Sequence, residues 1–304
     1  MSVPDLTGFL KSAYPNGSWP RPFHVLEGLQ RIAAGETPKD AAKTVGTSLH
    51  FLEKAQKSGR PEFDILGLQP SDLTAADLKK AGVILGQLLI GRTAEIAFED
   101  IYRQEIGADT EFKLVDLREG RTDTDYRVLN GRDRPVCRVN IKFFGSTFRR
   151  AVEMVGLPPD DCFPLATYKI FGALQKQEKE HLPYIFAIVG VPNLTAASIQ
   201  DQLPAEEIQI VALFSRSDRV AGKRNIEDKV VERIVAQKSA AFTEVYNRIR
   251  SADWYVLSAR KADNLLRSLL FERVFAMKIR GFAQQIPRCR ARHAFFSQKR
   301  LGDI

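Results

Sequence analysis

Cysteine and histidine are scarce in this chain of 304 residues, which contains 3 cysteines and 4 histidines. Cys137, Cys162 and Cys289 are too few and too widely spaced for a disulfide framework. No spacing of cysteine and histidine matches a four-ligand zinc site. We therefore expect no disulfide scaffold and no structural zinc, and we expect the chain to remain reduced in the cytoplasm.

Long apolar runs are also missing. No uninterrupted apolar stretch reaches the roughly eighteen residues of a membrane-spanning helix. The first residues, Met1-Ser-Val-Pro-Asp-Leu, lack a basic segment followed by an apolar one. A membrane span is therefore not expected. A phosphate loop of the Gly-x-x-x-x-Gly-Lys type is absent too, which argues against a nucleotide-hydrolysing P-loop protein.

Positive charge is in excess, with a formal net charge of +8 and an isoelectric point near 9.4. This balance favours an acidic partner such as nucleic acid. Basic residues gather near the C-terminus, where they alternate with Phe295 and Phe296: Arg288, Arg290, Arg292, Lys299 and Arg300. The pattern suits phosphate contacts and base stacking. A solubilising surface anchored by the two phenylalanines is the alternative.

A β-hairpin is predicted from alternation of polar and apolar residues between Asp123 and Phe143. Asp123, Asp125 and Arg127 share one face of the first strand, which runs to Leu129. Asn130-Gly131 supplies a turn whose residues tolerate positive φ. The return strand, 136–143, places Arg138, Asn140 and Lys142 on one face, and Cys137, Val139, Ile141 and Phe143 on the other. We expect Asp125 and Lys142 to be neighbours across the ladder.

Carboxylates beside a lysine have a use in phosphodiester hydrolysis. Carboxylate oxygens bind a hard divalent ion, which acidifies a bound water and stabilises charge on phosphorus. A lysine orients or deprotonates that water, or offsets phosphate charge. The structural alternative is that these polar residues only solvate the exposed face of a hairpin.

The order of expected elements around the hairpin supports the catalytic interpretation. A helix over 85–106 precedes strands near 111–117, 123–129 and 136–143, and a helix over 165–179 and a strand over 184–191 follow. This α-β-β-β-α-β order resembles the restriction-endonuclease-like core of the PD-(D/E)XK nucleases. Matched residue by residue, the resemblance implies Glu95 as the helix acid, Asp125 as the strand acid and Lys142 as the lysine. It also implies Mg²⁺ or Mn²⁺ as the cofactor.

The first residue of the (D/E)XK triplet departs from that family. Asn140 stands where a carboxylate is usual, and its amide offers one neutral oxygen. Asp123, on the same strand face as Asp125, is a candidate replacement metal ligand. Glu99, one helical turn after Glu95, is another, although we interpret it first as a solvated helix charge.

A second pattern lies upstream. Thr37-Pro38 predicts a helix start, and the chain is expected to turn at Val45-Gly46-Thr47 and to begin another helix at Ser48, with Leu49, Leu52 and Ala55 toward the core. Two short helices across such a turn resemble a helix-turn-helix. The second helix would then offer five residues to DNA: Ser48, His50, Phe51, Lys54 and Lys57. A helical hairpin used for packing or dimerisation is the alternative.

These observations predict an α/β protein, a mixed sheet flanked by helices, with a restriction-endonuclease-like core over 71–304 and an N-terminal helical domain over 1–70. Beyond Val191 we expect a strand over 208–215, a helix over 226–249 and a strand over 254–258.

The expected function is that of a magnesium-dependent endonuclease of double-stranded DNA. A homodimer is expected because cutting both strands needs two sites. A role in restriction or defence follows from family analogy alone. A non-catalytic DNA-binding regulator or complex subunit, which Asn140 favours, and an RNA nuclease are the alternatives.

Overall fold

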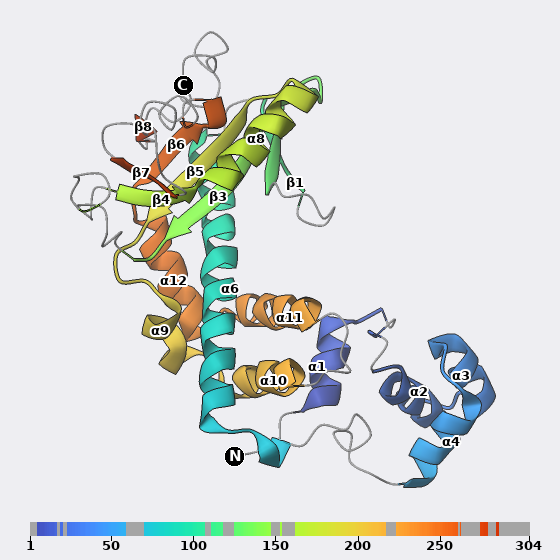
Figure 1. The fold of residues 1–304 in the computed structure, drawn as a ribbon. Coiled ribbons are helices and arrows are strands. Elements are labelled where there is room, and N and C mark those ends of the chain that lie inside the picture. The colour runs from blue at the N-terminus through green and yellow to red at the C-terminus, as the bar shows by residue number, and fades with distance from the viewer. Residues whose placement is uncertain are drawn as a thin grey trace. The chain divides into compact units, whose positions relative to one another are not determined.

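The chain divides into two compact units, which are shown in the computed structural model in Figure 1. Unit 1 comprises Met1–Leu89 and Ala196–Phe242, and unit 2 comprises Ile90–Thr195 and Thr243–Ile304. The region predicted as the N-terminal domain falls within unit 1, and a boundary at residue 70 stays a prediction. The structure describes residues 5–16, 19–20, 23–58, 70–106, 111–117, 125–146, 153, 162–216, 223–260, 262, 274–278 and 284–285.

Unit 1 is helical over its described part. Its core includes Phe23 and Phe214, whose rings meet edge to face with centroids 5.2 Å apart. Its helices and 3₁₀ turns are α1 (Leu6–Ala13), α2 (His24–Ala33), α3 (Pro38–Val45), α4 (Leu49–Ser58), η2 (Pro70–Asp72), the first part of α6 (Ala75–Ile101), α9 (Ala196–Ile199), η6 (Gln200–Gln202), α10 (Ala205–Arg216) and α11 (Lys223–Ala236).

The predicted pair of short helices is confirmed as α3 and α4. Thr37 caps α3 by accepting the N–H of Asp40, and Gly46 ends that helix with a φ of 67°. Leu52 is fully buried and packs α4 against α2. Leu49, which we expected in the core, is 38% exposed because it lies at the first turn of α4.

The strand expected over 208–215 is wrong, because this segment belongs to helix α10. Its run of apolar residues from Ile210 to Phe214 is buried throughout. A helix that is apolar on all sides lacks the amphipathic period that distinguishes it from a buried strand. Glu206 and Glu207 in its first turn favour the helix through its dipole.

The single helix expected over 226–249 is two helices, α11 and α12 (Ala240–Arg250). The chain breaks at Lys238, whose φ is 49°. Ser239 then caps α12 by accepting the N–H of Phe242.

Unit 2 is built on a mixed sheet flanked by helices, as the sequence predicts. Five strands lie in the order β1-β2-β3-β5-β6, and the two-residue β8 extends the β6 edge. Only the β3–β5 pair is parallel among these described pairs. β4 and β7 form a separate antiparallel pair. The strands are β1 (Lys113–Asp116), β2 (Tyr126–Leu129), β3 (Pro135–Phe144), β4 (Cys162–Ala166), β5 (Tyr184–Gly190), β6 (Trp254–Ser258), β7 (Val274–Lys278) and β8 (Gln284–Gln285).

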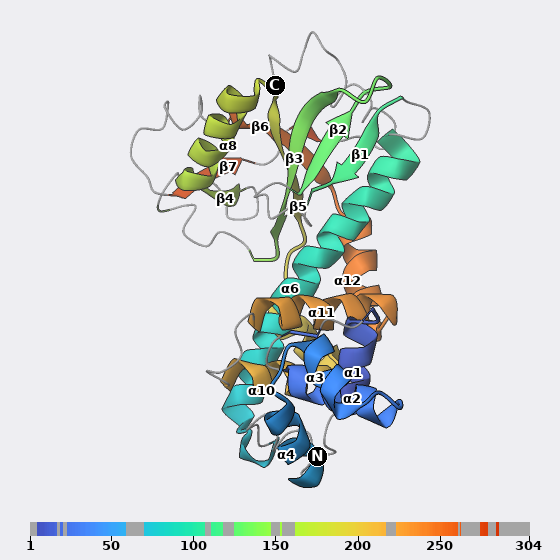
Figure 2. The same ribbon diagram turned by 90° about the vertical axis from the view of Figure 1, so that its right-hand side faces the viewer.

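Helices cover both faces of this sheet (Figure 2). On one face, Phe98 of α6 contacts the rings of Tyr126 and Trp254. On the other, Ile170 and Ala173 of α8 (Thr167–Glu180) share a core with alternate residues of β5 and β6. β5 is therefore buried on both faces, which explains its uninterrupted apolar sequence.

The polar face of β3 is covered as well. Arg138 and Asn140 are buried, and the Arg138 guanidinium donates to both carboxylate oxygens of Glu180 on α8, at 2.5 and 2.7 Å. The alternative in which these strand residues only solvate an open hairpin face does not describe β3.

α6 and the start of the π-helical turn that follows it (Tyr102–Ile106) form the one described segment, Ala75–Gln104, that is long and apolar enough to cross a membrane by length and composition. More than half of its most apolar 18-residue window is buried inside the protein. Its buried side chains include Leu85, Leu89 and Phe98, as in a core helix of a folded protein. The membrane criterion is therefore weak evidence here.

The hairpin turn differs from the predicted one. Positive φ falls on Asp133, at 54°, and not on Asn130 or Gly131. The side-chain oxygen of Asn130 instead accepts the backbone N–H groups of Arg132 and Arg134. Because the Asn130 side chain accepts these two N–H groups, the residue with left-handed backbone is Asp133, later in the loop.

This turn generates a stability prediction. Asp133→Val should lower the free energy of unfolding by about 1–2 kcal/mol, because a β-branched residue resists a left-handed backbone. Asp133→Asn, which tolerates that backbone but also loses the exposed ion pair with Lys113 at 3.2 Å, should change it little. Urea denaturation compares them. Equal losses in both variants would assign the effect to the ion pair instead.

Candidate functional site

Glu95, Asp125 and Lys142 meet within unit 2 although they come from three separate elements. Glu95 lies in α6, Asp125 comes directly before β2, and Lys142 lies in β3. The charges of both Asp125 and Glu95 act on Lys142, and the charge of Asp125 acts on Glu95. The structure thus brings together the helix acid, the strand acid and the lysine that the sequence singles out.

Asp125 is held in place by the strands on either side of it. Its carboxylate accepts the N–H of Ile141 in β3 at 2.5 Å, and its backbone oxygen accepts the N–H of Leu117 at 3.0 Å. Burial raises the pKa of Asp125, while the Ile141 N–H and the charge of Lys142 lower it. The carboxylate is therefore fixed in orientation.

The hairpin register differs by two residues from the expected one. Tyr126 pairs with Val139, so continuation of the ladder places Asp125 beside Asn140 and not beside Lys142. The positive charge of Lys142 still acts on Asp125 from further along β3.

Glu95 is half-buried and has an ion pair with Arg92, one turn earlier on α6, at 3.1 Å. Burial, followed by the negative charge of Asp125, raises the pKa of Glu95 to about 8, and Arg92 opposes this rise. Glu95 therefore holds a proton near neutral pH. A cation placed beside it would favour release of that proton.

Lys142 is set apart from an ordinary surface lysine by its surroundings. Burial lowers the pKa of Lys142 to about 8, although Asp125 opposes the change. Its ammonium donates to the backbone oxygen of Ile141 at 3.0 Å. A lysine with this pKa has a neutral fraction near pH 7 to 8 and is able to accept a proton.

Asp116 is a site residue that the sequence interpretation missed. It ends β1, opposite Tyr126, and its charge acts on both Glu95 and Asp125. Burial raises the pKa of Asp116 and Arg92 lowers it. The sequence feature that could have identified Asp116 is its position, since it is an acidic residue at the end of the strand that precedes the hairpin.

Glu99 is not merely a solvated helix charge. Its carboxylate accepts the hydroxyl of the buried Tyr126 at 2.6 Å. This bond connects α6 to β2 one turn after Glu95. Lys169, near the start of α8, completes the charged surroundings, since its charge acts on Asp125 and Lys142.

Asn140 is buried on the same face of β3 as Lys142. It remains the departure from the family pattern. The proposed replacement Asp123 lies outside the described residues, as do Arg288, Arg290, Arg292, Lys299 and Arg300.

No group of three His, Cys, Asp or Glu side chains placed to hold a metal ion occurs within the described ranges. The donor chemistry nevertheless suits a hard cation, because the charges of Asp125 and Asp116 raise the pKa of Glu95 and that of Asp116 raises the pKa of Asp125. A divalent ion would relieve that repulsion.

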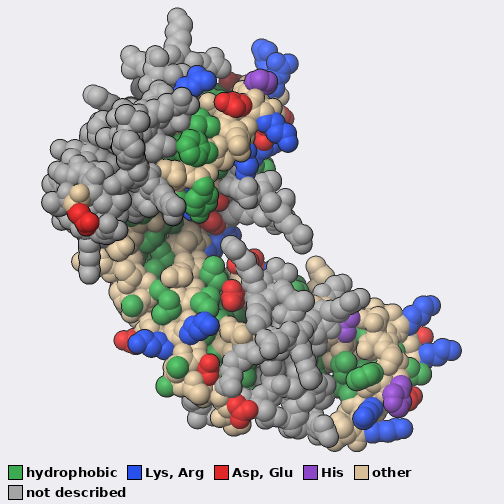
Figure 3. All heavy atoms as spheres, viewed as in Figure 1, with side chains coloured by type: hydrophobic (Ala, Val, Ile, Leu, Met, Phe, Trp, Pro, Cys, Tyr) green, Lys and Arg blue, Asp and Glu red, His purple; other side chains and the backbone are tan. Residues whose placement is uncertain are grey.

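The predicted DNA-facing residues of α4 are accessible. Lys and Arg side chains gather on the face of α3 and α4 seen in Figure 3. The Ser48 hydroxyl accepts the N–H of Phe51, whose ring is 65% exposed. The remaining three predicted contacts are also exposed: His50, Lys54 and Lys57.

Comparison with known proteins gives no relative: no protein-family model, curated protein or solved structure matches this chain. Interpretation of the site therefore rests on its own geometry and charge.

The raised pKa of Glu95 predicts how stability depends on pH. Between about pH 4.5 and 8, Glu95 is protonated in the folded state and ionised in the unfolded state. The unfolded state then binds fewer protons, so stability falls as pH rises, by up to about 1.4 kcal/mol per unit. Glu95→Gln should flatten this fall. Urea denaturation in EDTA at pH 5, 6 and 7 measures it, with exposed Glu178→Gln as the control. Identical slopes in wild type and Glu95→Gln would contradict the assignment.

Proposed function

We propose that this protein is a metal-dependent nuclease of the restriction-endonuclease-like, PD-(D/E)XK type, acting on double-stranded DNA. The observation that carries the proposal is the meeting of Glu95, Asp125 and Lys142 from α6, the start of β2 and β3. The element order α6-β1-β2-β3-α8-β5 supports it, with β4 added before α8.

Glu95 and Asp125 would bind Mg²⁺ or Mn²⁺, and the charge of Asp116, which acts on both of them, would add to the attraction for the ion. The ion would acidify water and stabilise charge on the phosphate. Lys142 would orient a water molecule or accept its proton, because burial lowers the pKa of Lys142 to about 8. Lys169 adds positive charge on the α8 side, where an incoming phosphate would need it.

Duplex DNA is the proposed substrate because α4 presents exposed lysines after a helix-turn-helix-like turn. A homodimer belongs to the same proposal, since two sites are needed to cut two strands. So does a cytoplasmic location, which rests on the scarcity of cysteine.

The second candidate is a DNA-binding regulator or complex subunit with an inactive centre. Asn140 is the observation that favours it. An RNA nuclease would share the same acid and lysine arrangement and is distinguished only by substrate.

The nuclease is tested by incubating supercoiled plasmid, linear duplex and single-stranded RNA with the protein in Mg²⁺, Mn²⁺ or EDTA. Cleavage should require metal, and Lys142→Ala should reduce its rate about a hundredfold or more. Asp125→Ala should do the same. Lys80→Ala, a change at an exposed lysine of α6 outside the acid centre, is the control and should cut normally.

Each outcome of that cleavage assay distinguishes between the DNA nuclease, the regulator and the RNA nuclease. Cutting of duplex that is lost in Lys142→Ala supports the proposal. Binding without cutting under every condition favours the regulator, and cutting restricted to RNA identifies the third alternative.

The proposed role of the α4 surface in DNA binding is tested by measuring how duplex affinity depends on salt concentration. Lys54→Ala and Lys57→Ala should each weaken duplex binding and reduce the slope of log affinity against log salt by about 1, because each lysine would release one counterion. Lys11→Ala on α1 is the control. Unchanged slopes, also after removal of residues 1–59, would make this region a packing or dimerisation module.

A further inference from the structure

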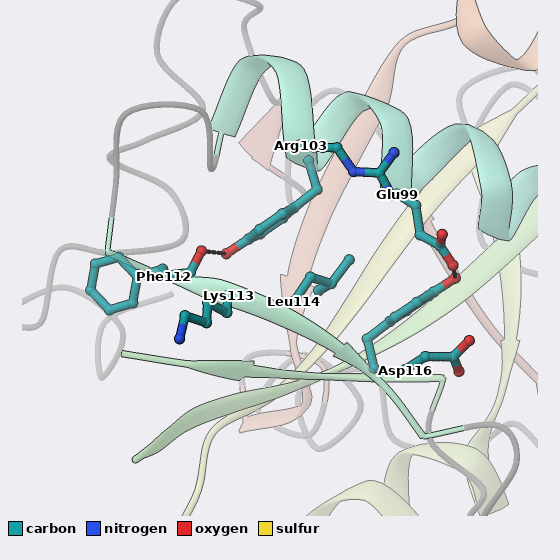
Figure 4. Close-up of a pocket in the computed structure, with 8 residues that line it drawn as sticks. Glu99, Arg103, Phe112, Lys113, Leu114 and Asp116 are labelled. Carbon is teal, nitrogen blue, oxygen red and sulfur yellow. Dashed lines mark hydrogen bonds between the residues drawn. The ribbon is translucent and has the colours of Figure 1, made fainter. Parts of the chain in front are cut away.

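A cavity of about 340 Å³ lies beside the acid residues in unit 2. It is formed between the end of α6, the turn after it, and β1 (Figure 4). Its size falls within the range of small-molecule and cofactor sites. Its lining residues are Glu99, Tyr102, Arg103, Phe112, Lys113, Leu114, Asp116 and Tyr126.

The cavity adjoins the proposed nuclease centre directly. Asp116 lines it, and the same carboxylate acts electrostatically on Glu95 and Asp125. Glu99 lines it one helical turn after Glu95. A molecule that places a phosphate at the centre therefore places its neighbouring groups at the mouth of this cavity.

Three of the lining residues are aromatic, and the rings of Tyr102 and Tyr126 lie behind the cavity surface with little exposed area. The hydroxyl of the buried Tyr102 donates to the backbone oxygen of Phe112 at 3.4 Å, and that of Tyr126 donates to Glu99 at 2.6 Å. Since both hydroxyls are engaged, the rings are held in place. A rigid inner wall beside the partly exposed Phe112 suits a flat aromatic ligand.

The polar groups of the cavity have a definite order. Figure 4 shows the carboxylates of Glu99 and Asp116 at one end and Lys113 toward the other. Carboxylates accept hydrogen bonds, so that end suits a ligand with N–H donors. The side chains of Arg103 and Lys113 are 73% and 66% exposed, and their surface ion pairs are weak enough to exchange for phosphate.

We propose that this cavity receives one nucleobase turned out of the stack beside the scissile phosphate, with preference for bases that carry an exocyclic amino group. The inference rests on the proposed function, because the base and the phosphate belong to one strand. Glu99 or Asp116 accepts from the amino group, as acidic side chains do from cytosine. Burial in the cavity and contact with Phe112 offset part of the cost of leaving the duplex.

The test uses the full chain carrying Lys142→Ala, which should bind duplex without cutting it. Oligonucleotide duplexes that contain the cleavage site mapped with wild-type protein are altered one nucleotide at a time to an abasic residue. An abasic residue should weaken binding about tenfold at a single position next to that site. Elsewhere along the duplex it should have little effect.

Leu114→Trp fills the cavity and should abolish that position-specific loss. Val115→Trp is the matched control, since Val115 is the next residue of β1 and is not among the lining residues. Glu99→Gln, which keeps the side-chain shape, provides a second readout. It should reduce the preference for cytosine or adenine over thymine at the sensitive position.

The outcomes separate this proposal from the nuclease itself. A flat abasic scan in a protein whose parent cuts DNA in Mg²⁺ overturns the cavity proposal and leaves the nuclease standing. If the parent never cuts, the scan is made on a duplex that the protein binds, and one sensitive position that is lost in Leu114→Trp then supports the cavity and overturns the nuclease. Absence of nucleic-acid binding overturns both.

Discussion

Everything at the acid centre depends on the packing of Phe98 against the sheet. Its ring contacts Tyr126 at 5.8 Å and Trp254 at 5.6 Å between centroids, and it is almost fully buried. Because Glu95 precedes it by one helical turn, this contact sets how far the helix acid stands from the strands. The bond from Tyr126 to Glu99 then fixes the rotation of α6 above β2. An apolar contact thus positions a polar site.

The charged groups of the acid centre are held in positions that are electrostatically unfavourable. Glu95, Asp116 and Asp125 are partly removed from water and repel one another, while Lys142 is held where its charge is disfavoured. Arg92 and the N–H of Ile141 offset only part of this cost. Such an arrangement contributes little to folding, and its chemistry is best suited to bringing a cation and an anion together.

Much of unit 2 could be predicted from local pattern. Alternation identified β2 and β3, and the acids of α6 and the hairpin were recognisable by spacing. Asp116 was missed because its role depends on the β1–β2 register, which brings it opposite Tyr126. Glu99 was misjudged because its hydroxyl partner lies 27 residues away in sequence. The helix α10 was mistaken for a strand because burial on all sides removes the helical period.

Two helices carry the chain from one unit to the other without a linker. Of the three division points, Leu89/Ile90 and Phe242/Thr243 fall inside α6 and α12, and Thr195/Ala196 comes directly before α9. A genetic exchange that replaced only one unit would have to join two foreign half-helices in register. Exchange of one unit as a module is therefore disfavoured, and substitution within the existing units is the simpler route to a change in what the protein binds.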